Sequence, residues 1–153
     1  MKSRVLDHKP QLEKIINECD VCHIAMVDEN NMPYVLPFNF GYANDEIIMH
    51  SAQQGKKIDI LKNNNNVCVA FSNGYELRAQ NENVACSYSW KYRSVLAYGK
   101  VEFIEDFNEK IDALNAIMKN YTDKEFSYND PAVKDVNCWK VKVEKFEGRA
   151  YGY

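Results

Sequence analysis

The sequence has no surplus of positive charge. Its 153 residues include 19 Lys and Arg against 22 Asp and Glu, which gives a formal net charge of −3. Proteins that bind nucleic acid or an anionic membrane surface through their overall charge have the opposite balance. We therefore expect neither partner, and an anionic ligand has to be met by a local group of cations.

Long apolar runs are also missing. No stretch of 18 apolar residues occurs, so the sequence predicts no membrane-spanning helix. Residues 1–10 are charged and contain no apolar stretch, which argues against a secretory signal. The five cysteines are an odd number without the pattern of a small disulfide-rich scaffold, which fits a reducing compartment. Together these absences predict a cytoplasmic protein.

Internal repeats and linkers are absent as well, so we expect residues 1–153 to form a single domain with a substantial core. Strands are predicted over 22–27, 34–40, 46–50, 67–71, 84–89, 94–104 and 138–146. Helices are predicted over 11–18, from Ser51 to a stop within 63–66, and from a capping pattern at 106–109. Residues 72–83 are expected to form a loop or irregular hairpin, and Pro131 is expected to break 120–135. This succession predicts a mainly β, α+β fold, an antiparallel β-barrel with helical additions.

The strongest local feature is the segment His50-Ser-Ala-Gln-Gln-Gly-Lys-Lys57, where a predicted strand meets a predicted helix. Ser51 and Gln54 match a capping box at the start of that helix. A helix N-terminus offers unpaired amides and a partial positive charge, and the two lysines add full charges, so the segment can bind a phosphate. From these residues alone, a surface helix with two solvated lysines is the simpler interpretation.

Four motifs occur in order over about residues 5–148: Pro33-Tyr-Val-Leu-Pro-Phe38, His50-Ser-Ala…Gly-Lys-Lys57, Tyr92-Arg-Ser-Val95 and Gly99. In this order and spacing they resemble the pyridoxamine 5′-phosphate oxidase-like superfamily, and within it the nitroimidazole-resistance (Nim) flavoproteins. The resemblance implies an antiparallel split β-barrel of the FMN-binding type. It also implies a homodimer that binds FMN in a groove between its two subunits.

The resemblance further implies which residues contact the flavin. Leu36, Pro37, Phe38 and Asn39 would run beside the isoalloxazine ring and offer backbone hydrogen bonds. His50 and Ser51 match the end of the strand that contacts the ribityl phosphate, and Gly55, Lys56 and Lys57 would hold the phosphate. Tyr92 and Ser94 would contact the flavin from the barrel, within one subunit or across the dimer. Leu36 stands where the oxidases carry a phosphate-binding arginine, and pyridoxamine phosphate is not the expected substrate.

These implications predict an FMN-dependent oxidoreductase that reduces a small-molecule electron acceptor such as a nitroaromatic compound. The cofactor would transfer the electrons, and His50 is the candidate catalytic residue. The alternative is a non-catalytic module on the same barrel, a store or sensor that holds flavin, or holds haem through His50. A purely structural role for His50 also stays open.

Several other patterns receive a structural interpretation. Cys19-Asp-Val-Cys-His23 matches the pattern for covalent haem attachment, but no zinc-type second pair follows it, and we predict no metal site. Cys68, Cys86 and Cys138 are predicted to be core thiols. The aromatic stretch from Tyr88 to Tyr98 is predicted to pack in the core and the dimer interface, with stacking near the flavin as the alternative.

Overall fold

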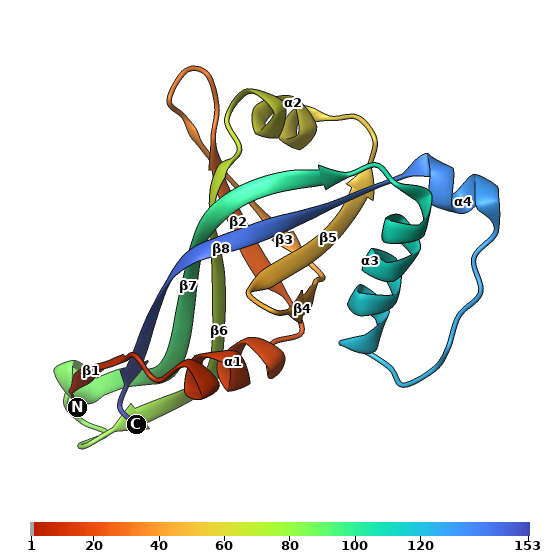
Figure 1. Ribbon diagram of the computed structural model, residues 1–153. Helices are drawn as coiled ribbons and strands as arrows, with labels where there is room; N and C mark the ends of the chain where they lie inside the picture. The colour runs from red at the N-terminus through yellow and green to blue at the C-terminus, as the bar shows by residue number, and fades with distance from the viewer. Residues whose placement is uncertain (1) are drawn as a thin grey trace.

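The computed structural model describes residues 2–153 and consists of a curved sheet with helices at its margins (Figure 1). The strands are β1 (Ser3–Leu6), β2 (Cys22–Val27), β3 (Pro33–Phe38), β4 (Gly41–Ala43), β5 (Glu46–Ala52), β6 (Asn66–Ala79), β7 (Tyr88–Ile104) and β8 (Val136–Tyr151). The helices are α1 (Lys9–Asn17), α2 (Lys56–Asn63), α3 (Phe107–Lys119) and α4 (Asp130–Asp135), with a 3₁₀ turn, η1 (Ala85–Ser87).

The sheet is antiparallel throughout and has the order β3-β2-β6-β7-β8-β5-β4, with β1 added to β8. Because β3 and β4 end this order, hydrogen bonds do not close the sheet into a complete barrel. The architecture is therefore the predicted mainly β, α+β split barrel. Among residues 2–153, no helix is long and apolar enough to span a membrane.

Alternating side chains fill the inside of the curve. Ile24, Val69, Val95 and Trp139, from four different strands, are each fully buried in one apolar cluster. Helix α1 adds its own apolar stripe to this cluster, so it covers one end of the barrel. Burial of this kind is the main stabilising contribution to a domain of this size.

Helix α3 packs on the other side of the sheet, directly against β4. A side chain at Gly41 would place its Cβ only 2.6 Å from the carbonyl oxygen of Ala116. Glycine at this position therefore permits the close approach of helix and strand. A second, smaller apolar cluster, with Ile104, Ala113 and Cys138 at its centre, lies between α3 and the outside of the barrel.

The structure confirms the predicted strand Cys22–Val27 and the helix cap at Asp106, whose carboxylate accepts a hydrogen bond of 3.0 Å from the Glu109 amide. For residues 72–83 the loop is wrong and the irregular hairpin is confirmed, because β6 continues to Ala79 after a register shift between Asn73 and Glu76 and pairs with β7. Pairing with β7 overrides the polar composition of this segment.

Two further predictions are wrong. The strand predicted over 84–89 begins with η1 instead, and β7 starts only at Tyr88. Pro131 lies in the first turn of α4, where its missing N–H costs no hydrogen bond, so it begins a helix rather than breaking one. The side chain of Asn129 caps this helix by accepting a hydrogen bond of 2.9 Å from the Ala132 amide.

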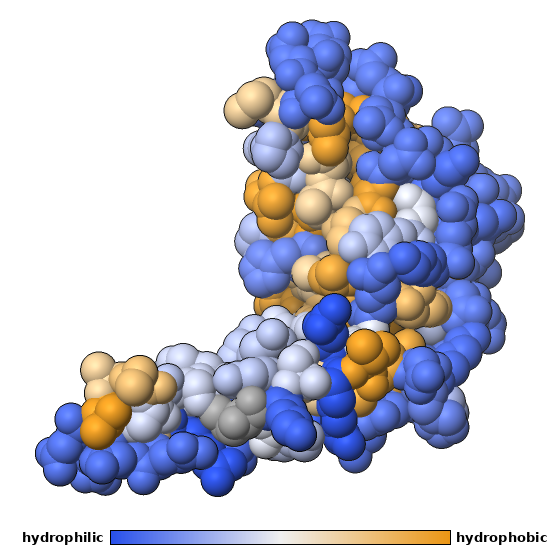
Figure 2. All heavy atoms as spheres, turned by 90° about the vertical axis from the view of Figure 1, so that its left-hand side faces the viewer, coloured by the Kyte–Doolittle hydropathy of each residue, from blue (hydrophilic) through white to orange (hydrophobic). Residues whose placement is uncertain are grey.

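On the N-terminal side of Tyr92, β7 pairs with β6 but, in the described chain, no longer with β8. We call this two-stranded extension the arm (residues 75–92). Leu77 and Trp90 lie opposite each other on one face of the arm and are 52% and 55% exposed. Glu76 and Lys91 lie opposite each other on the reverse face and form an ion pair of 2.9 Å. Figure 2 shows the arm as a projection from the lower end of the body. The arm is thus amphipathic, with an apolar face that its own chain does not cover.

Candidate functional site

The segment between β5 and α2 differs from the predicted capping box. Strand β5 pairs with β8 as far as Ala52, so Ser51 lies inside the strand and not at a helix start. Its hydroxyl accepts a hydrogen bond of 3.3 Å from the Trp139 indole and donates one of 2.9 Å to the Ala52 carbonyl. The capping prediction for Ser51 is therefore wrong, because strand pairing continues two residues beyond His50.

Helix α2 begins instead at Gly55. This residue has φ +130° and ψ 168°, a conformation that only glycine adopts readily, and no side chain caps the helix. A Cβ at Gly55 would meet no atom within 4 Å, so the space in front of the helix is open. The amides of Lys56 and Lys57 are in the first turn, where no acceptor exists within a helix. Unpaired amides, two ammonium groups and open space together suit an anion.

Strand β3 lies next to this helix start. The Lys56 ammonium lies 4.6 Å from the centre of the Tyr34 ring, and the Phe38 ring packs edge-on against Trp139 at 5.4 Å. Leu36 and Phe38 pack on the core, whereas Pro37 and the following Asn39 are exposed. Because β3 ends the sheet order, one of its edges has no strand partner and presents free backbone groups. The structure thus places Tyr34 beside Lys56, and Phe38 beside Trp139, the hydrogen-bond partner of Ser51.

Two residues at this junction were not predicted from the sequence. Tyr34 and Trp139 connect β3 to α2 and to β5, respectively. Trp139 lies in the predicted strand 138–146, but a strand pattern alone does not show which residue of another strand it contacts. The hydrogen bond to Ser51 depends on pairing between segments 88 residues apart.

His50 points away from Ser51, since successive side chains of a strand face opposite sides. It lies opposite Cys138 on β8, on the side where the smaller apolar cluster packs. The imidazole is half-buried, and its Nδ1 atom has no hydrogen-bond partner among residues 2–153. The side chains of His50 and Ser51 therefore lie on opposite faces of the sheet, although the backbone of both residues borders the helix start.

Burial lowers the pKa of His50 below its ordinary value of 6.5. The unfolded chain therefore binds a proton at this site more readily than the folded chain. The contribution of neutral His50 to the free energy of unfolding is therefore fully present above about pH 6.5, and it is lost as the pH falls. We expect the free energy of unfolding of the apoprotein to decrease from pH 7.5 to pH 5, and His50→Gln to flatten that decrease. Denaturant titrations at several pH values measure the free energy of unfolding of both proteins. If it decreases with falling pH as steeply in the variant as in the wild type, a group other than His50 causes the decrease.

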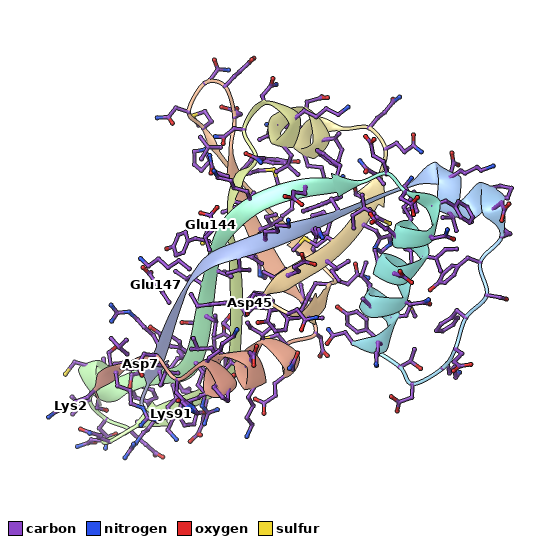
Figure 3. The ribbon with its side chains drawn as sticks, viewed as in Figure 1. Lys2, Asp7, Asp45, Lys91, Glu144 and Glu147 are labelled. Atoms are coloured by element: carbon purple, nitrogen blue, oxygen red, sulfur yellow. The ribbon has the colours of Figure 1, made fainter. Side chains whose placement is uncertain are left out.

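Tyr92 and Ser94 lie far from the junction. Tyr92 pairs with Tyr151, and Ser94 lies between Ser72 and Arg149. At the other end of β7, Ile104 pairs with Cys138 of β8, which in turn pairs with His50 of β5. Ten residues separate Ser94 from Ile104, which is about 33 Å of extended strand. Figure 3 shows Lys91, the neighbour of Tyr92, at the lower end of the molecule, away from α2. The start of α2 and the Tyr92 end of β7 therefore lie apart within one chain. Strand pairing through β2 and β6 nevertheless aligns Pro37 of β3 with Leu96 of β7, two residues from Ser94.

The cysteine motif lies in the core. Cys19 and Cys22 are buried, and burial raises the pKa of the Cys22 thiol to about 12, which keeps it protonated and unreactive. Cys138 is buried as predicted, but Cys86 is exposed in η1, so its assignment as a core thiol is wrong. No group of three metal-ligating side chains lies together within the described part of the chain.

Comparison with known proteins agrees with this fold. A family model described as pyridoxamine 5′-phosphate oxidase matches residues 8–150. The chain belongs to this family. No curated protein matches it.

Solved structures extend the comparison. A candidate 5-nitroimidazole antibiotic resistance protein from Bacteroides thetaiotaomicron is 46% identical, with a TM-score of 0.88, 97% of this chain and 87% of that chain covered. An FAD and haem binding protein from Mycobacterium smegmatis is 16% identical, with a TM-score of 0.84, 100% of this chain and 75% of that chain covered. The flavocytochrome Anf3 from Azotobacter vinelandii is 16% identical, with a TM-score of 0.82, 99% of this chain and 70% of that chain covered. At 16% identity, the last two show the shared fold alone.

Proposed function

We propose that this member of the oxidase family binds FMN and reduces a small acceptor, such as a nitroaromatic compound. The observation that carries the proposal is the start of α2. There Gly55, two first-turn amides and two lysines form an open anion site beside the free edge of β3. The 46% identical candidate 5-nitroimidazole resistance protein supports the class of acceptor.

The residues present suit FMN. Lys56 and Lys57 would hold the phosphate through charge-assisted hydrogen bonds, with the amides at the helix start. The unpaired edge of β3 at Leu36–Asn39 would offer backbone groups to the ring, and the backbone of His50 and Ser51 would border the phosphate. Bound FMN would supply the electron-transfer chemistry, while the protein binds and orients it.

The proposal includes a homodimer with the flavin groove at its interface. Tyr92 and Ser94 would contact the flavin held at Lys56 either within one subunit or across this interface. A reducing, cytoplasmic location is also part of the proposal, because all five cysteines are free thiols.

Steady-state kinetics test the proposed reaction. FMN-loaded protein is mixed with a reduced nicotinamide and a 5-nitroimidazole, and nicotinamide oxidation is followed over many turnovers. We expect sustained turnover that depends on the nitro compound. Bound flavin without turnover would instead support the binding module, and a haem spectrum would support the variant of that module in which His50 binds haem.

A further inference from the structure

The hydroxyl of Tyr121 joins two segments at the end of the β2–β3 pair. It accepts a hydrogen bond of 2.9 Å from the Phe40 amide and donates one of 2.8 Å to the Asp20 carbonyl. Phe40 follows β3 and is fully buried, and Asp20 precedes β2. A side chain from the segment after α3 therefore connects the two strands where their own pairing stops.

The place of this hydroxyl follows from the register of β2 and β3. Their last paired residues at this end are Cys22 and Phe38. Two residues farther on, the same register sets Asp20 opposite Phe40. A direct hydrogen bond from the Phe40 amide to the Asp20 carbonyl would continue the ladder. The Tyr121 hydroxyl stands in the place of that bond, as an acceptor toward one strand and a donor toward the other.

The alternation of hydrogen bonds along the ladder agrees with this assignment. In an antiparallel pair of strands, hydrogen-bonded pairs of residues alternate with pairs that make no such bond. Extended by one residue at the other end, the register sets Asp28 opposite Met32, and the first donates from its amide to the carbonyl of the second. Every second pair from there is hydrogen-bonded, and the pair that contains Phe40 is one of them. Pro33 and Pro37 fall between these pairs, where a missing N–H removes no ladder bond.

This alternation decides what the end of β3 presents to a ligand. The odd-numbered residues turn their backbone groups away from β2, to the edge that no strand of residues 2–153 pairs. Within Leu36–Asn39 these residues are Pro37 and Asn39. Proline offers only its carbonyl, so Asn39 supplies the N–H of this stretch. Asn39 lies beyond the last residue of β3, and the bridge from Tyr121 to the next residue keeps it in the strand register.

Helix α3 fixes the position of the Tyr121 side chain. The helix ends at Lys119, and the Tyr121 amide continues its last turn by donating to the Met118 carbonyl at 2.9 Å. Helix and sheet come closest at Gly41, the residue after Phe40, where a Cβ would clash with the helix backbone. This contact brings the end of α3 to the corner between β3 and β4 (Figure 1).

We propose that Tyr121 is a positioning residue for the flavin ring, because its hydroxyl holds the Asn39 N–H at the free edge of β3, where that N–H binds the ring. The inference rests on the proposed function. The pyrimidine side of a flavin ring carries a carbonyl oxygen on each side of an N–H, and this edge of β3 offers the complementary carbonyl and N–H groups. Reduction adds negative charge to that side of the ring, so an N–H donor held there favours the reduced flavin.

Two single variants and a control test the role of the bridge. Tyr121→Phe removes the hydroxyl and keeps the ring, and Asn39→Pro removes the N–H itself and leaves the bridge. Tyr42→Phe is the matched control, because the Tyr42 hydroxyl also makes two hydrogen bonds, each of 3.1 Å, to the carboxylates of Glu13 and Asp45. For each protein, the free energy of unfolding of the apoprotein, the affinities for FMN and riboflavin, and the midpoint potential of bound FMN are measured.

We expect Tyr121→Phe to weaken FMN and riboflavin by the same factor, about fivefold, because the ring and not the phosphate loses a contact. The midpoint potential of bound FMN should fall by about 30 mV, which corresponds to a tenfold larger loss for reduced than for oxidised flavin in a two-electron couple. Asn39→Pro should reproduce this fall, and the double variant should show no further one, because both changes remove the same contact. Tyr42→Phe should change only the stability of the apoprotein.

A purely structural Tyr121 gives a different result. If Tyr121→Phe lowers the stability of the apoprotein but leaves the potential and both affinities at wild-type values, the inference is overturned. It is also overturned if only the affinity for FMN falls, or if Asn39→Pro leaves the potential unchanged. Wild-type protein that binds no flavin would contradict the proposed function as well, whereas FMN that binds without turnover would contradict the proposed reaction alone.

Discussion

Replacing Lys56 and Lys57 together by alanine is expected to weaken FMN binding by about 2–5 kcal/mol, because two charge-assisted contacts to the phosphate are lost. Riboflavin lacks that phosphate, so its affinity should change far less. The fold should persist, since Lys56 is exposed and its contact with the Tyr34 ring is worth only about 0.5–1 kcal/mol. Titration of the apoprotein with each ligand, followed by flavin fluorescence, gives both affinities.

Lys62→Ala is the matched control for this experiment. Lys62 is an exposed lysine of the same helix, in its last turn and away from the anion site. It should leave the affinity for both ligands unchanged. Equal losses of FMN and riboflavin affinity in the double variant would show that these lysines do not bind the phosphate.

The second large effect is expected at Trp139. Trp139→Ala should lower the free energy of unfolding by about 3–5 kcal/mol, because a fully buried indole leaves a cavity that its neighbours fill only partly. The same change removes the ring packed against Phe38 and the donor to Ser51, so it also loosens β3 from β5. Denaturant unfolding of the apoprotein measures the loss.

Ser51→Ala separates the two contributions of Trp139. It removes the acceptor of the buried indole, together with the exposed hydrogen bond from Ser51 to the Ala52 carbonyl, and should lower the free energy of unfolding by about 1 kcal/mol. If Trp139→Ala lowers the free energy of unfolding no more than Ser51→Ala does, packing of the indole does not hold the two ends of the sheet together.

Local sequence signals predicted the elements whose stabilising contacts are themselves local. The cap at Asp106 and the alternation of Cys22–Val27 depend on neighbours a few residues away, and both predictions were confirmed. The same kind of signal was misleading at Ser51, since pairing of β5 with β8 extends the strand past the expected cap. For residues 72–83 the composition left a loop and an irregular hairpin open, and pairing of the two strands with each other selects the hairpin.

The candidate site was predictable as a set of motifs but not as a geometry. The sequence order placed Gly55 and its two lysines in the first turns of a helix that begins at Ser51, whereas in the structure Gly55 itself precedes the helix start. It did not show that His50 and Ser51 face opposite sides, because the predicted strand ended at His50, whereas β5 continues to Ala52. Nor did it show that Tyr92 lies at the far end of the sheet, since that follows from the long β7–β8 pairing.

The absorption spectrum of the protein purified without added cofactor tests the central claim most directly. We predict a flavin spectrum, and FMN as the flavin released on denaturation, at about one molecule per chain. Protein without flavin absorbance that also fails to bind added FMN, or that releases another cofactor in its place, would contradict the account.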